Sequence, residues 1–137
     1  MQIKQRRRKP IPKKPSGRAG PRRAHLRCVA VVGSLEEARA ALAGARAPVL
    51  FVSPPGSAAS LGLGYFSALV EAMRAEFPQI AIDAVIDCGD EPGRALAALR
   101  MGFKIVALRG HPRARAAVAA IARALGARLL RHAPRAS

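Results

Sequence analysis

Short apolar runs and longer amphipathic segments alternate along the chain from residue 26 to residue 132. The apolar runs cover residues 26–32, 49–52, 80–87, 103–108 and 127–130, and they read as strands buried on both faces. The segments between them carry apolar residues at intervals of three and four, which is typical of helices. This pattern predicts βαβαβαβαβ, an open, mostly parallel five-stranded doubly wound sheet.

Three of the predicted helices carry particular signals. Ser34 and Glu37 form a capping box at the start of the first helix. In the last helix we expect Ala114, Ala117, Val118, Ile121 and Leu125 to face the core. The second helix, beginning near residue 61 or 64, carries an apolar stripe that ends before a proline: Phe66, Leu69, Val70, Met73 and Phe77.

Residues 80–108 form the central unit of this prediction, a strand, a turn, a short helix and a further strand. The unit implies parallel pairing with a right-handed crossover. Its turn, Asp87-Cys88-Gly89-Asp90, carries two acids and a thiol directly ahead of a helix. The ordinary interpretation of Asp90 is a helix cap, and His111 before Pro112 is read in the same way.

In a doubly wound sheet, ligands bind beyond the carboxyl ends of the strands, at the switch point. Loops at residues 33–34, 53–57, 87–90 and 110–111 fall there. The loop at residues 53–57 places serines and a glycine ahead of a helix and could hold an anion, but an ordinary connection is the favoured interpretation of this loop. The candidate ligand-binding residues are Ser53, Gly56, Ser57, Asp87, Cys88, Gly89, Asp90 and His111.

The same loops give no convincing set of catalytic residues. Cys88 would need a lowered pKa to act as a nucleophile, and the neighbouring Asp87 and Asp90 oppose that shift. Asp87, Cys88, Asp90 and His111 have no diagnostic metal-ligand spacing, so we predict no metal site and no cofactor. We expect a binding protein rather than an enzyme.

Charge is distributed very unevenly along the chain, whose net charge is +16. Residues 1–27 hold eleven basic and no acidic residues, residues 28–91 three basic and eight acidic, and residues 92–137 ten basic and no acidic. Residues 1–25 are rich in proline and like charges and predict a disordered arm; residues 26–132 form one α/β domain, and residues 133–137 are expected to fray.

Basic segments attract polyanions, which supports an alternative function in which the protein associates with RNA or the ribosome. An arginine excess from GC-rich coding is the competing explanation. For RNA the arm would supply phosphate contacts and the last helix would position the protein. The residues of this alternative are Arg6, Arg7, Arg8, Lys9, Lys13, Lys14, Arg22, Arg23, Arg113, Arg115 and Arg123.

The compartment is predicted from cysteine content and hydropathy. Two cysteines, Cys28 and Cys88, do not make a disulfide framework, which favours a reducing cytoplasm. No apolar run approaches the ~20 residues that span a bilayer, so we expect no membrane contact. The sequence does not define an oligomeric state.

Two family resemblances rest on residues 87–108. The turn and helix, with Gly89-Asp90 and Gly102, resemble the last motif of haloacid-dehalogenase-type phosphatases. Arg94 stands where that family has its second acid and the DxDx[TV] motif is absent, so its activity is not carried over. Residues 48–132 also resemble small uncharacterised bacterial α/β proteins with a DCGDxxGxALAALRxG turn and helix, which implies a fold but no function.

The first functional hypothesis is therefore a small cytoplasmic α/β domain that binds a small anionic ligand or a partner at the carboxyl ends of its strands.

Overall fold

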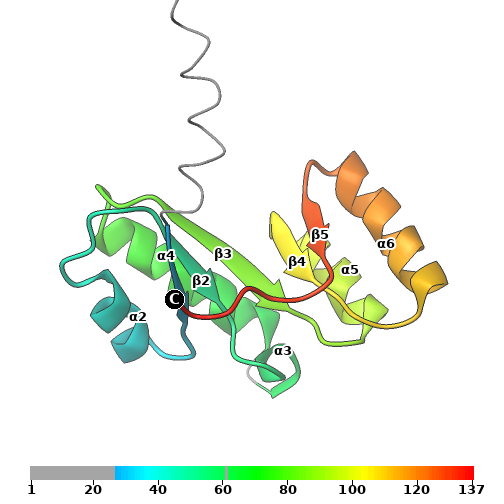
Figure 1. Ribbon diagram of the computed structural model, residues 1–137, viewed down its shortest axis with the longest axis horizontal. Coiled ribbons are helices and arrows are strands. Elements are labelled where there is room, and N and C mark those ends of the chain that lie inside the picture. Colours follow the sequence, from blue (N-terminus) through cyan, green and yellow to red (C-terminus); the bar gives the residue numbers. More distant parts are fainter. Residues whose placement is uncertain (1–26, 61) are drawn as a thin grey trace, which may run out of the picture.

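The computed structural model describes residues 27–60 and 62–137. These residues form an alternating series of strands and helices (Figure 1). The basic arm over residues 1–25 and Leu61 lie outside the described residues. In chain order the elements are β1 (Cys28–Val31), α2 (Leu35–Leu42), β2 (Val49–Val52), α3 (Ser57–Ser60), α4 (Leu63–Glu76), β3 (Ile82–Asp87), α5 (Pro92–Arg100), β4 (Ile105–Ala107), α6 (Pro112–Ala124) and β5 (Arg128–Leu130).

The strands form one parallel sheet in which sequence neighbours are also spatial neighbours, in the order β1-β2-β3-β4-β5. Val29 pairs with Leu50 and Leu50 with Asp83, while at the other end Val106 pairs with Leu129. The predicted class, an open parallel α/β sheet of five strands alternating with helices, is confirmed. The prediction was a mostly parallel sheet, and in the structure every described strand pairing is parallel.

The winding of the sheet differs from the doubly wound arrangement that we expected. Buried residues from all five described helices join one core cluster on one sheet face, for example Ala38, Met73 and Val118. The cluster on the other face contains residues of strands and of the chain after β5, and none from a described helix. Successive right-handed crossovers to the next strand always place the helix on the same side. The sheet that residues 27–60 and 62–137 form is therefore wound once, in two layers, and has no switch point.

The second face of the sheet is apolar although no described helix covers it. Leu50, Val52 and Val85 point to this face and are buried. Residues 131–137 run across it from β5 towards β1, as the red segment in Figure 1 shows. We call this the open face, and residues 131–137 the C-terminal strap.

The C-terminal strap is bonded to β1, whereas we expected residues 133–137 to fray. The Val29 N–H donates to Ser137 Oγ at 2.9 Å, and the Ser137 N–H donates to the Val29 carbonyl at 3.0 Å. Ala133 packs against the apolar open face. An edge strand offers unpaired backbone groups, and the strap satisfies some of those of β1.

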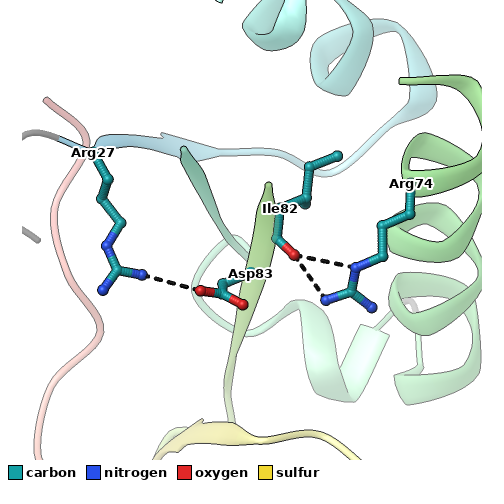
Figure 2. A network of polar contacts seen from close by, with 4 residues as sticks. All are labelled: Arg27, Arg74, Ile82 and Asp83. Carbon is teal, nitrogen blue, oxygen red and sulfur yellow. Dashed lines mark hydrogen bonds and ion pairs between the residues drawn. The ribbon is translucent and has the colours of Figure 1, made fainter. Parts of the chain in front are cut away.

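The sheet splits at one point, between the amino ends of β3 and β4. β3 pairs with β2 at Ile82–Val85 but with β4 only at Ile86 and Asp87. Figure 2 shows how one backbone group at the split is satisfied: Arg74 donates from Nε and Nη2 to the Ile82 carbonyl at 3.1 and 2.9 Å. The same view shows Arg27 reaching Asp83 on β3 at 3.3 Å.

Helix α6 is turned differently from the prediction. Val118 and Ala122 face the core, whereas Ile121 and Leu125 are exposed by 43% and 47%. An alanine-rich helix offers apolar residues in most directions, so periodicity alone does not choose the buried face. The stripe predicted for α4 is buried at Phe66, Leu69, Val70 and Met73.

No helix in the described part of the chain has both the length and the apolar content needed to cross a membrane.

Candidate ligand-binding groove

The loops at the carboxyl ends of the strands lie side by side in chain order. A Cβ placed on Gly33 would lie 3.0 Å from Pro54 Cγ, which brings together the loops after β1 and β2. The Asp87 N–H donates to Ser53 Oγ at 2.9 Å, which joins the ends of β2 and β3. Gly110 lies against Asp90, which joins the loops after β3 and β4. Parallel strands place these loops at one edge, as the sequence predicts.

A groove of about 550 Å³ lies on the open face at this edge. Its floor comes from the ends of β1, β2 and β3, and its walls come from the loop after β4 and from the C-terminal strap. We call it the carboxyl-end groove. Its lining residues are Val31, Val52, Ser53, Pro55, Asp87, Arg109, His132, Ala133, Pro134, Arg135 and Ala136.

The polar floor is built by a chain of short hydrogen bonds around Asp87. Ser53 is 1% exposed, and its hydroxyl oxygen accepts the Asp87 N–H. Asp87 Oδ1 accepts the Gly89 N–H at 2.9 Å, which closes a turn that Gly89 fits with a φ of 60°. Residues 83, 85 and 87 occupy every second position of β3, so their side chains share the open face. The Asp87 carboxylate therefore lines the groove at the end of β3.

The basic wall comes from segments that follow the acidic floor in the sequence. The Arg109 N–H donates to the Gly89 carbonyl at 2.7 Å, and Arg109 Nη1 lies 3.8 Å from Asp87 Oδ1. The Arg109 side chain is about half exposed and lines the groove. His132 and Arg135 reach the same groove from the C-terminal strap, and both are exposed.

Cys88 lies on the opposite side of the sheet from the groove. Its neighbour Asp87 points to the open face, so strand alternation sends Cys88 into the core beneath the helices, where it is 2% exposed. Burial, with the charges of Asp87 and Glu91, raises the pKa of the Cys88 thiol to about 12. Arg94 acts in the opposite direction but with a smaller effect than burial. Cys88 is thus a core residue and an inert thiol.

The other predicted site residues support the loops and do not line the groove. His111 Nδ1 accepts the Arg113 N–H at 3.2 Å and caps α6, as expected. Asp90 was expected to cap α5, but the N-cap position is Glu91, and Asp90 is exposed beside Gly110. The remaining two lie near the start of α3: Gly56 has a φ of 78°, and Ser57 is buried.

The three basic residues of the groove, Arg109, His132 and Arg135, are not among the ligand-binding residues that the sequence predicts. Arg109 directly follows an apolar strand, at the same edge as Asp87, and that position was a usable signal. His132 and Arg135 gave none, because nothing in residues 131–137 predicts that they cross the open face.

No family model and no curated protein matches this chain.

Among residues 27–60 and 62–137, no three histidine, cysteine, aspartate or glutamate side chains gather as they would around a metal ion. Asp87 is the one carboxylate among the described lining residues of the groove, and its neighbours there are the Ser53 hydroxyl, basic side chains and apolar side chains. The donor set is suited to hydrogen bonding and ion pairing.

Proposed function

We propose that the protein binds a small anionic ligand in the carboxyl-end groove. The observation that carries this proposal is the convergence of Arg109, Arg135 and His132 on one groove from two separate segments. The volume of about 550 Å³ falls within the usual range for small-molecule sites, roughly 300–1,000 Å³. Val31, Val52 and Pro55 add apolar surface for a carbon skeleton.

Arginine is suited to this role because its planar guanidinium binds carboxylate or phosphate through two parallel hydrogen bonds. Arg109 is held at its backbone by the Gly89 carbonyl, so its position does not depend on the weak 3.8 Å contact with Asp87. A ligand anion can therefore take the guanidinium without disturbing the loop. The proposal is one of binding, and it assigns no reaction to the groove.

Titration of the full chain with inorganic phosphate and propyl phosphate, followed by NMR, tests this function. We expect shifts at the backbone amides around Gly89, Arg109 and Arg135 with saturation in the millimolar range or below. Arg109→Gln together with Arg135→Gln should weaken binding by about tenfold or more, because two charge-assisted hydrogen-bonding groups are lost. The matched control is Arg113→Gln with Arg123→Gln, which removes the same charge from α6 outside the groove.

Equal weakening by both pairs of substitutions would mean that general positive charge attracts the anion, and the groove proposal would be wrong. Failure of every phosphate tested, at tens of millimolar, to bind to the unmodified protein would have the same consequence.

RNA binding is the second candidate, and one observation favours it. Residues 92–137 hold ten basic and no acidic residues, and Arg113 and Arg123 are exposed on α6. Arg115 is less suited to it, because its Nε donates to the Leu108 carbonyl at 2.6 Å. The arm residues of this proposal lie outside the described residues.

Salt dependence separates the two candidates. If the basic segments bind RNA phosphates, the logarithm of the affinity falls steeply with the logarithm of salt, with a slope of about −0.7 per phosphate contacted on single strands. Full-length protein with Arg6, Arg7 and Arg8 changed to glutamine should then show a shallower slope. A slope near zero, or RNA binding abolished by millimolar propyl phosphate, would contradict this candidate.

The proposed compartment is the cytoplasm. Cys28 and Cys88 are both free thiols, which is the usual state in a reducing compartment.

A further inference from the structure

Asp87 carries a buried carboxylate that the protein satisfies on one side only. Its side chain is 9% exposed. Oδ1 accepts the Gly89 N–H at 2.9 Å and lies 3.8 Å from Arg109 Nη1. Oδ2 accepts no hydrogen bond from residues 27–60 or 62–137. Buried polar atoms in proteins are satisfied in the great majority of cases, so an acceptor left this way within a groove indicates where a donor binds.

The neighbouring residues hold this carboxylate in place. The backbone of Asp87 is anchored by Ser53 Oγ, and the Gly89 N–H holds Oδ1. With Oδ1 held by the Gly89 N–H, Oδ2 is the carboxylate oxygen left for a ligand, on the open face where the groove lies. The serine oxygen already accepts the Asp87 N–H, and at 1% exposure it is too buried to serve as the principal ligand contact.

Building on the proposed function, we infer that the ligand is an anion that carries its own hydrogen-bond donor, a hydroxyl or an ammonium group. The anionic end binds Arg109 and Arg135, and the donor binds Asp87 Oδ2. The carbon skeleton between these ends lies on Val31, Val52 and Pro55. A simple anion would pair with the arginines, but it would also lie beside the negatively charged Asp87 carboxylate. Because such an anion has no donor for Oδ2, this proximity disfavours its binding.

A ligand of this kind accounts for the position of Asp87, an acid, in a groove with basic walls. A site for a bare anion gains from arginine alone, and a buried carboxylate there weakens the attraction. A ligand with both groups uses both charges of the groove. Buried polar groups that require a matching partner also discriminate strongly against analogues that lack it.

Four phosphates test the inference by calorimetric or NMR titration of the full chain. Inorganic phosphate and propyl phosphate carry no added donor, glycerol 3-phosphate carries hydroxyls, and O-phosphoethanolamine carries an ammonium group. We expect at least one donor-bearing compound to bind about tenfold more tightly than propyl phosphate, which is the effect of about one good hydrogen bond. The compound that binds most tightly identifies the donor.

Asp87→Asn is the decisive variant. Its Oδ1 keeps the Gly89 N–H, so the groove presents Nδ2, a donor, where the carboxylate presented an acceptor. The advantage of the donor-bearing phosphates should fall to within about twofold of propyl phosphate. Asp83→Asn is the matched control, since it removes the same charge from an exposed side chain of β3 outside the groove, and it should keep the full preference.

The outcomes separate this inference from the function on which it rests. If all four phosphates bind equally to the unmodified protein, the groove is an anion site and the inference is wrong. If none binds, the proposed function itself is wrong. The comparison of ligands needs only the unmodified protein, so it decides the question even if Asp87→Asn does not fold.

Discussion

The two halves of this molecule differ in what they contribute: residues 27–87 supply most of the large buried side chains, and residues 92–137 supply most of the positive charge of the described chain. Residues 27–87 carry eight of the ten largest fully buried side chains of the described chain, including Phe51, Leu42 and Met73. Residues 92–137 contribute Leu108 and Val106 to that group, with strands of three residues and helices rich in alanine. The later half instead carries ten basic and no acidic residues.

The carboxyl-end groove lies where these halves meet. Its buried polar floor, Ser53 and Asp87, belongs to the first half, and its basic wall, Arg109 and Arg135, belongs to the second. The first half holds the carboxylate among buried residues, and the second supplies exposed cations. A buried acceptor beside exposed cations offers a small ligand both a hydrogen-bond acceptor and positive charge.

Truncating the central strand of the first half should have the largest effect. Phe51 on β2 is 0% exposed, and Phe51→Ala should lower the free energy of unfolding by about 3–5 kcal/mol. Tyr65→Ala is the matched control because this aromatic side chain is 43% exposed, and it should cost less than about 1 kcal/mol. Urea denaturation followed by circular dichroism measures both. Similar losses at the two positions would contradict the assignment of the core to β2.

Two substitutions on α6 test which of its faces is buried. Val118 is 2% exposed and Ile121 is 43% exposed, although both belong to the apolar stripe expected to face inward. Val118→Ala should lower the free energy of unfolding by roughly 1.5–3 kcal/mol, and Ile121→Ala by less than about 1 kcal/mol. Thermal and urea unfolding of the two variants gives the comparison. A larger loss of stability for Ile121→Ala than for Val118→Ala would instead mean that the face containing Ile121 is the buried one.

Cys88 allows a test of burial at the end of β3. Its pKa is raised from 9.0 to about 12 because burial disfavours the thiolate, whereas the unfolded chain ionises near the ordinary value. The unfolded state therefore loses its proton first, and the free energy of unfolding should fall by about 1.4 kcal/mol per pH unit between these values. The difference between the unmodified protein and Cys88→Ala in alkaline urea titrations isolates this contribution from that of other groups.

The rate of reaction with a thiol reagent is a second and simpler measure of the burial of Cys88. In the native state at neutral pH, only the exposed Cys28 should react rapidly, and both thiols should react after unfolding. Rapid native reaction of Cys88 in a Cys28→Ser variant would show that the end of β3 is open.

The fold was predictable from local pattern, because strands that are apolar on both faces and amphipathic helices each leave a period in the sequence. The winding was not, since strand order depends on which edge of the sheet each new strand joins. Asp87 was found as a site candidate from its place after a strand, and the structure puts it in the groove. Cys88, one residue later, lies on the other face, and the alternation of the strand was a sufficient reason to separate the two.

The basic wall shows the limit of sequence reasoning more clearly. Arg135 reaches the groove because the strap crosses the open face and Ser137 pairs with the backbone of Val29. Backbone pairing of this kind has no sequence signature, since any residue except proline can supply the N–H. A basic, proline-containing segment reads as a solvated tail, and only the geometry of β1 assigns it a place.

The smallest expected effect on stability comes from the contact that joins the two halves across the groove. Arg109 Nη1 lies 3.8 Å from Asp87 Oδ1 and its side chain is 52% exposed, so the pair is weak and screened by water. Arg109→Gln keeps the backbone N–H bond to the Gly89 carbonyl and should change the free energy of unfolding by less than about 0.5 kcal/mol. The same variant should nevertheless lose affinity for phosphates. A loss of stability above about 2 kcal/mol would instead mean that the arginine is committed to holding the halves together, and a side chain so committed would not be available to bind a ligand.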